Sequence, residues 1–280
     1  MKVGVSGASG QLGTATIKHL LERLPASAIV GISRTPETVA KLGVESRFGD
    51  FDKPESLEAA FAGLDKVLII PTVDLRPGAR QIQHSAAIDA AVKAGVGHIT
   101  FVSAVGTRAT LAISDGYFKP EQNLMRTAPQ WSILRMAYYI ESFAQEAQQS
   151  LGHGVLASLS ATPVNFVSRD DVAAAAAGIL ATDGHNGAIY NATGLENFSG
   201  DQRAAAVSKA AGKQLPFVQV TREQYAGGLT QAGLPDFIVD AVLAIQDAWG
   251  AGAFEVITGD VERLSGKKPR TFADELAKVF

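Results

Sequence analysis

Three glycines close to the amino terminus have the spacing and setting of a phosphate-binding loop. The segment Gly7-Ala8-Ser9-Gly10-Gln11-Leu12-Gly13 follows an apolar strand-like segment and opens an amphipathic helix-like one, and this setting is more specific than the glycines alone. Gly7 would allow a tight turn, Gly10 would let the backbone approach a pyrophosphate, and Gly13 would let helix and strand pack closely. The helix amino terminus would add free N–H groups. The residues that we expect to bind a dinucleotide are Gly7, Ser9, Gly10, Gln11, Leu12 and Gly13. The alternative is that this segment is a plain strand-to-helix turn.

The second apolar segment ends in a cation. It runs into Ile32-Ser33-Arg34-Thr35, at the place where an NAD site usually has a carboxylate for the ribose 2′-hydroxyl and an NADP site has a cation for the 2′-phosphate. Arg34 offers a planar guanidinium that suits a phosphate, and Ser33 and Thr35 add hydroxyl groups. We therefore predict that the cofactor is NADPH. The alternative is that Arg34 is only a solvated loop residue.

Four further residues stand at or just beyond the ends of later strand-like segments. Asp50 and Phe51 follow the third segment and are expected to flank the adenine, although a plain turn explains Asp50 equally well. Thr72 lies in the Pro71-Thr72-Val73 loop after the fourth segment and is expected to contact the cofactor. Ser103 ends the fifth segment, where it either touches the nicotinamide or the substrate or serves as a structural hydrogen-bonding residue.

The tyrosine and lysine that often work together as an acid in dehydrogenases have the wrong spacing here. That pair is separated by three residues, because side chains four positions apart share one face of a helix. This chain has Tyr117-Phe118-Lys119, and two positions are about 200° of helical rotation. Pro120 followed by Glu121 also predicts that the helix begins near Lys119, which leaves Tyr117 in the preceding loop. We assign no catalytic acid and expect Tyr117 to contact the substrate.

Short apolar segments alternate with helix patterns along the first half of the chain. Ile17, Leu20, Leu21 and Leu24 follow the spacing of one helix face, and Asp52 followed by Glu55 resembles a capping box. The alternation predicts an α/β fold with a doubly wound parallel Rossmann sheet. Its expected strands are Val3–Ser6, Ile29–Ser33, Val44–Phe48, Val67–Ile70, Ile99–Ser103 and Trp131–Leu134.

The pattern changes after about Gly152 to longer helical stretches with few strands. We expect residues 1–152 to form an NADP-binding Rossmann domain. Residues 153–280 are expected to form a smaller, mainly helical region over the carboxyl edge of the sheet, where a substrate pocket would lie, with some strands returning to the main sheet. The expected helices are Arg169–Thr182, Ser199–Ala211, Arg222–Ala232 and Asp236–Trp249, and the strand candidates are Ala188–Asn191 and Phe217–Val220.

Composition excludes several classes of function. The 280 residues carry a formal net charge of -3, so no basic face of the kind that binds nucleic acid is expected. There is no cysteine, which removes disulfides, thiolate nucleophiles and Cys-ligated zinc and fits a reducing compartment. The five histidines have no metal-binding spacing. No signal peptide or membrane span is evident, so we expect a cytoplasmic protein. Its expected partner is a small molecule, and a homodimer is a possible assembly.

The ordered set of motifs resembles the NmrA-like atypical short-chain dehydrogenase/reductase family, in particular its quinone oxidoreductase type 2 and triphenylmethane reductase group. The resemblance covers nearly the whole chain and rests on the glycine loop, Arg34 and Gly49-Asp50-Phe51, together with Val167-Ser168-Arg169-Asp170-Asp171 and Asp260-Val261-Glu262-Arg263-Leu264 in the second half. It implies NAD(P)H binding and, in the enzymatic members, hydride transfer to quinones, dyes or similar conjugated acceptors. Other members are redox-sensing regulators without turnover.

The resemblance implies a chemistry that needs little acid catalysis. Hydride addition to a quinone or a cationic dye yields a delocalised product that water can protonate, so we predict an NADPH-dependent oxidoreductase that acts on a conjugated acceptor. Tyr138, Tyr139 and Phe143 follow the sixth strand; we prefer Tyr138 as a residue of the acceptor pocket and Phe143 as a core residue. The alternative is a non-catalytic NADP(H)-sensing regulator that binds a partner protein, because the missing tyrosine-lysine pair is compatible with both.

Overall fold

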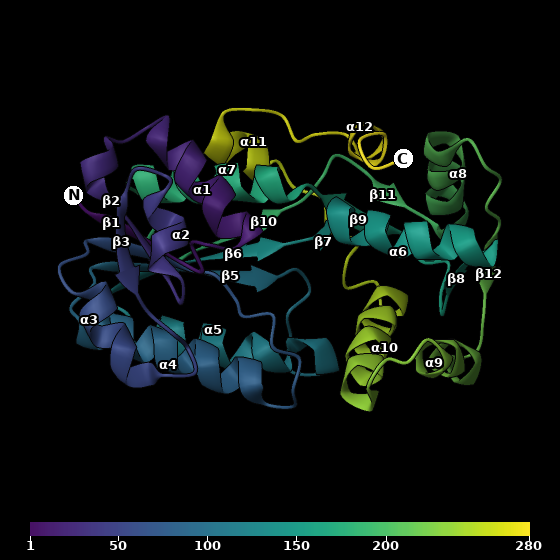
Figure 1. The fold of residues 1–280 in the computed structure, drawn as a ribbon, viewed down its shortest axis with the longest axis horizontal. Helices are drawn as coiled ribbons and strands as arrows, with labels where there is room; N and C mark the ends of the chain where they lie inside the picture. The colour runs from purple at the N-terminus through teal and green to yellow at the C-terminus, as the bar shows by residue number, and fades with distance from the viewer.

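The chain is built around one parallel sheet of seven strands. The computed structural model describes residues 1–280, and its main sheet has the order β10-β6-β5-β4-β1-β2-β3 (Figure 1). β1 pairs with both β2 and β4, so the strand order reverses beside it and opens a crevice at the carboxyl ends of the strands. The strands are β1 Val3–Ser6, β2 Ile29–Ser33, β3 Glu45–Phe48, β4 Lys66–Ile69, β5 His98–Ala104, β6 Gln130–Met136 and β10 Ala188–Ala192.

Helices cover both faces of this sheet, as Figure 1 shows. Ile17 and Leu20 belong to a core on one face, and Ile88 and Leu124 belong to a second core on the other. The first layer comprises α1 (Gln11–Leu21), α2 (Pro36–Ala40), α7 (Arg169–Ala181) and α11 (Asp260–Ser265). The second layer comprises α3 (Leu57–Phe61), α4 (Ala79–Lys93) and α5 (Phe118–Thr127). Because both faces are covered, β1, β2, β4 and β5 are buried along their whole length.

The remaining elements lie beyond the carboxyl edge of the sheet (Figure 1). Two small sheets join β7 (Tyr138–Tyr139), β9 (Val164–Val167) and β11 (Asn197–Phe198) in one, and β8 (Leu156–Ser158) and β12 (Phe217–Gln219) in the other. Around them pack α6 (Ile140–His153), α8 (Gly200–Ala211), α9 (Arg222–Gln231), α10 (Asp236–Gly250) and α12 (Phe272–Leu276). These elements place a helical layer over the crevice at the end of the sheet.

The alanine-rich run of α7 lets this helix pack closely between its neighbours. Val172 to Leu180 is buried without interruption, because small side chains allow α1 and α11 to approach from two sides. Gly178 marks the tightest point, since a Cβ there would lie 2.0 Å from the backbone oxygen of Leu264. The longest apolar run of the sequence is therefore a core helix, and no helix of the structure combines the length and apolarity that a bilayer span requires.

The predicted doubly wound parallel sheet is confirmed, and all seven of its strands overlap segments that the sequence predicts as strands or strand candidates. One local prediction was wrong. Asp52 does not cap a helix: its carboxylate accepts a hydrogen bond from Gln83 Nε2 at 2.7 Å, and a short 3-10 turn at Pro54–Ser56 precedes α3. The strand candidate Phe217–Val220 is confirmed as β12, Phe217–Gln219, which pairs with β8 outside the main sheet. The division of the chain after residue 152 stays a prediction, and both α7 and β10 pack with the main sheet.

Candidate functional site

A cavity of about 810 Å³ occupies the crevice at the carboxyl ends of the strands. At one end it is lined by the glycine loop, Arg34, Asp50 and Phe51, which we call the glycine-loop half. At the other end it is lined by α10, and we call this the α10 half; its lining includes Leu75, Arg80, Ile113, Tyr117, Tyr138, Phe237 and Ile245. The two halves form one continuous space, and clefts of this kind at the ends of parallel strands are where proteins bind small molecules.

The glycine loop has the backbone geometry that its sequence predicts. Gly7 has a φ of +64°, a conformation that favours glycine. A Cβ at Gly13 would lie 2.3 Å from the Gly7 carbonyl oxygen and 2.7 Å from the Ala8 Cα, so only glycine lets α1 approach β1 this closely. Gly10 caps α1 without a side-chain hydrogen bond, and the first turn of the helix holds no acidic residue. The free N–H groups at this end of α1 therefore suit a pyrophosphate.

Arg34 lies at the mouth of the glycine-loop half with an unengaged guanidinium. Its side chain is exposed, lines the cavity and takes part in none of the ion pairs of the structure. The neighbouring Ser33 hydroxyl lies 2.7 Å from the Ser9 hydroxyl and accepts a hydrogen bond from the Thr35 N–H at 3.0 Å. These contacts tie the end of β2 to the glycine loop, so a cation and two hydroxyls stand beside the helix terminus, as a 2′-phosphate requires.

Asp50 and Phe51 line the same half of the cavity. The Asp50 carboxylate also accepts a hydrogen bond from the Asp52 N–H at 3.1 Å, and its own N–H donates to the Ser56 hydroxyl at 3.0 Å. Both interpretations of Asp50 thus describe the structure: it shapes a turn and it faces the cavity. Its role toward an adenine stays a prediction.

His84 joins two cavity-lining segments, and nothing in the sequence marked it for this role. Its Nε2 accepts a hydrogen bond from the Thr72 N–H at 2.9 Å, and its Nδ1–H donates to the Gly116 carbonyl oxygen at 2.7 Å. Burial lowers the pKa of His84 to about 4, and the nearby Arg80 charge acts in the same direction. The neutral ring therefore connects the loop after β4, which carries Thr72, to the segment that leads into Tyr117.

Tyr117 and Ser103 have different positions relative to the cavity. Tyr117 is 5% exposed, lines the α10 half and packs against the His84 ring at 6.0 Å between centroids. It precedes α5, as predicted, while Lys119 is exposed and lies outside the cavity lining. Ser103 is fully buried, and its hydroxyl lies 3.4 Å from that of Thr107. The structure does not bring Ser103 to the cavity, because its side chain points into the packed core.

Tyr138 lines the α10 half, and its hydroxyl is already engaged in a hydrogen bond. Its ring packs edge-on against Trp249 at 5.0 Å between centroids, and its hydroxyl donates to the Glu146 carboxylate. Burial, together with this carboxylate, raises the pKa of Tyr138 well above its usual value. Phe143 is 2% exposed and packs against Phe166, as expected of a core residue.

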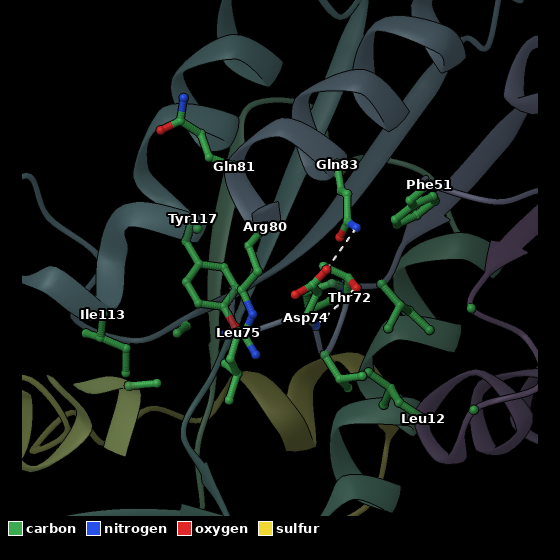
Figure 2. A pocket seen from close by; sticks show the side chains of 18 of the residues that line it. Leu12, Phe51, Thr72, Asp74, Leu75, Arg80, Gln81, Gln83, Ile113 and Tyr117 are labelled. Atoms are coloured by element: carbon green, nitrogen blue, oxygen red, sulfur yellow. Dashed lines mark hydrogen bonds between the residues drawn. The ribbon is translucent and has the colours of Figure 1, made fainter. Parts of the chain in front are cut away.

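The sequence also left several lining residues without a role. α10 contributes Phe237, Ala241, Ala244 and Ile245 to the cavity wall, although its sequence reads simply as an amphipathic helix. Arg169 stacks on the Tyr139 ring at 4.6 Å. Arg80 lines the same half of the cavity, and Figure 2 shows it beside Tyr117. Only the folded chain brings these residues, which are far apart in the sequence, to one space.

Known proteins resemble the chain over nearly its whole length. A family model described as NAD(P)H-binding matches residues 7–183. Quinone oxidoreductase 2 of Escherichia coli is 29% identical over 283 residues, covering 99% of this chain and 98% of that protein, and its crystal structure with NADPH has a TM-score of 0.92 with 99% of both chains covered. The triphenylmethane reductase of Citrobacter sp., crystallised with NADP(H), is 30% identical with a TM-score of 0.89 and 99% of both chains covered. The NAD(P)H azoreductase of Xenophilus azovorans is 29% identical over 279 residues, or 98% of this chain and 96% of that protein.

Proposed function

The chain belongs to the NAD(P)H-binding family, and from this premise we propose that it is an NADPH-dependent reductase that transfers hydride to a quinone-like or other conjugated acceptor. The observation that carries the proposal is the continuous cavity, which joins an uncapped helix terminus and a free arginine at one end to an apolar, aromatic half at the other. The resemblance to the quinone oxidoreductase type 2 and triphenylmethane reductase group is confirmed. The relatives named for quinones, azo compounds and triphenylmethane dyes share conjugated acceptors as their substrates.

The residues of the glycine-loop half fit NADPH. The glycine loop and the amino terminus of α1 would hold the pyrophosphate, Arg34 with Ser33 and Thr35 would hold the 2′-phosphate, and Phe51 would lie against the adenine. When bound, NADPH supplies the hydride. The protein's contribution is to fix the approach of the acceptor and to exclude water from the α10 half.

The α10 half supplies packing surfaces and no tyrosine-lysine acid pair. Lys119 is exposed and lies outside the lining, so it is not placed to act with Tyr117. The Tyr138 hydroxyl is engaged by Glu146. A conjugated acceptor suits such a site, because the electrons that it receives are delocalised and its protonation by solvent can follow hydride transfer.

The test is a screen for NADPH oxidation, followed at 340 nm, with quinones, azo compounds, triphenylmethane dyes and enones. We expect turnover with at least one quinone or dye and little with simple aldehydes. The Gly10→Leu variant is the control, because its side chain would enter the path of the pyrophosphate. Tight NADPH binding without oxidation of any acceptor would refute the reductase proposal and favour a sensor that binds a partner protein.

A further inference from the structure

The α10 half contains one arginine whose charge the protein leaves uncompensated. Arg80 lies in the first turn of α4 and lines the cavity. It takes part in none of the ion pairs of the structure, and its buried Nε has no hydrogen-bond partner. Buried polar groups in proteins are almost always hydrogen-bonded, so an unpaired donor at a cavity wall points to a partner that arrives with a ligand.

Two other arginines that line the cavity already have partners. Arg76 pairs with the Asp74 carboxylate, and Arg169 lies 4.0 Å from the Glu141 carboxylate. Arg34 is also free, but it lies in the glycine-loop half, beside the predicted site of the 2′-phosphate. Arg80 is therefore the free cation of the half that would receive the acceptor.

The structure holds the Arg80 side chain in place. Its guanidinium carbon lies 5.9 Å from the centre of the Tyr117 ring, a cation–π arrangement. A Cβ at Gly116 would lie 2.8 Å from the Arg80 Cβ, so the absence of a side chain there makes room for the arginine stem. Figure 2 shows the Tyr117 and Arg80 side chains side by side, both extending toward Leu75. A guanidinium held in this way loses little conformational freedom when an anion binds to it.

The surroundings of Arg80 combine an apolar wall with a few carboxylates that do not neutralise it. Leu75, Ile113 and Tyr117 line the cavity next to it and suit the flat face of an aromatic acceptor. Asp115 and Asp240 also line the cavity, but both are exposed and neither pairs with Arg80. A charged hydrogen bond in such a partly apolar setting is stronger than one in water.

We propose that Arg80 makes this half of the cavity selective for conjugated acceptors that carry an anionic substituent, such as a sulfonate or a carboxylate, and that the substituent binds to the Arg80 guanidinium beside the Tyr117 ring. This inference rests on the proposed reductase function and specifies its substrate class. The substituent stays unchanged in the reaction, so Arg80 is a specificity-determining residue and takes no part in hydride transfer.

The experiment compares 1,4-naphthoquinone-2-sulfonate with uncharged 1,4-naphthoquinone as acceptors for the wild-type protein and for Arg80→Met. The measured quantity is the ratio of kcat/KM for the sulfonate to kcat/KM for the neutral quinone. Both proteins meet the same two quinones, so the difference in reduction potential between the quinones cancels. We expect the ratio to fall by about 10- to 100-fold in Arg80→Met, which is the range of one charged hydrogen bond, and to recover in part in Arg80→Lys.

Two controls make the outcome specific. Lys119→Met removes an exposed cation outside the cavity lining and should leave the ratio unchanged, and NADPH affinity should be the same in all variants. Turnover of both quinones with an unchanged ratio in Arg80→Met would overturn the Arg80 proposal and leave the proposed function standing. If neither quinone is reduced, calorimetric binding of naphthalene-2-sulfonate to the NADPH-saturated protein tests Arg80 independently of turnover. An equal Kd for wild type and Arg80→Met would overturn the Arg80 proposal.

Discussion

Acid should destabilise this protein through His84, the residue that connects two segments of the cavity wall. The fully buried ring needs its neutral form, because its Nε2 accepts from Thr72 and its Nδ1–H donates to Gly116. In the folded protein its pKa is lowered from 6.5 to about 4. Between these two values the unfolded chain binds a proton and the folded chain does not, so the free energy of unfolding falls as the pH falls.

The size of this effect follows from the width of the pH window. Each pH unit between 6.5 and 4 removes about 1.4 kcal/mol, so His84 should lower the free energy of unfolding by about 2 kcal/mol at pH 5 compared with pH 7.5. The His84→Gln variant cannot titrate in this range. It should be less stable than wild type at pH 7.5, since one amide cannot easily replace both hydrogen bonds, but its stability should depend less on pH.

The assay is urea unfolding of both proteins at pH 7.5 and pH 5, followed by circular dichroism. Burial also lowers the pKa of His98 to about 4, but His98 is present in both proteins and its effect cancels in the comparison. The wild-type loss between the two pH values should exceed that of the variant by about 2 kcal/mol. Equal losses would refute the assignment of a neutral, buried His84 as the acid-sensitive group.

Substitutions at four further positions test the site. Arg34→Met should weaken NADPH binding by about tenfold or more and leave NADH binding unchanged in a fluorescence titration; equal wild-type affinities for the two cofactors would remove Arg34 from the site. Gly10→Leu should abolish NADPH binding with a normal circular dichroism spectrum, and retained affinity would mean that the loop is only structural. Tyr117→Phe should lower kcat far less than the roughly 10²- to 10⁴-fold loss of a general acid, so a collapse of kcat with intact NADPH affinity would reveal an unusual acid. Tyr138→Ala should raise KM, because it removes a packing contact that is equally strong in the ground state and the transition state. Tyr138→Phe keeps the ring and should change KM little. Equal effects of the two variants on KM would mean that the hydroxyl, and not the ring, contacts the acceptor.

The glycine-loop half of the cavity could be predicted because its residues lie within or directly after short sequence motifs. Gly7, Gly10 and Gly13 are constrained by contacts within one loop and its own helix, and Arg34 follows directly from the end of the next strand. Parallel strands place their carboxyl ends at one edge, so the alternation of strand and helix patterns was enough to bring these segments together. Ser103 shows the limit of this rule. Successive residues at the end of a strand point to different sides, and the sequence position does not say which of them faces the cavity and which faces the core.

The composition of the α10 half could not be predicted from the sequence, because it depends on tertiary packing. The doubly wound sheet, the glycine loop and the missing tyrosine-lysine spacing could be predicted without the structure, since each follows from short-range periodicity or from neighbours within a few residues. The folded structure was needed to show that α10 lines the cavity, that His84 lies between Thr72 and Gly116, and that Arg80 has no counter-charge. Those facts depend on which distant side chains meet, and a lone histidine or arginine on a helix has the same local pattern whether it faces solvent, a carboxylate or a cavity.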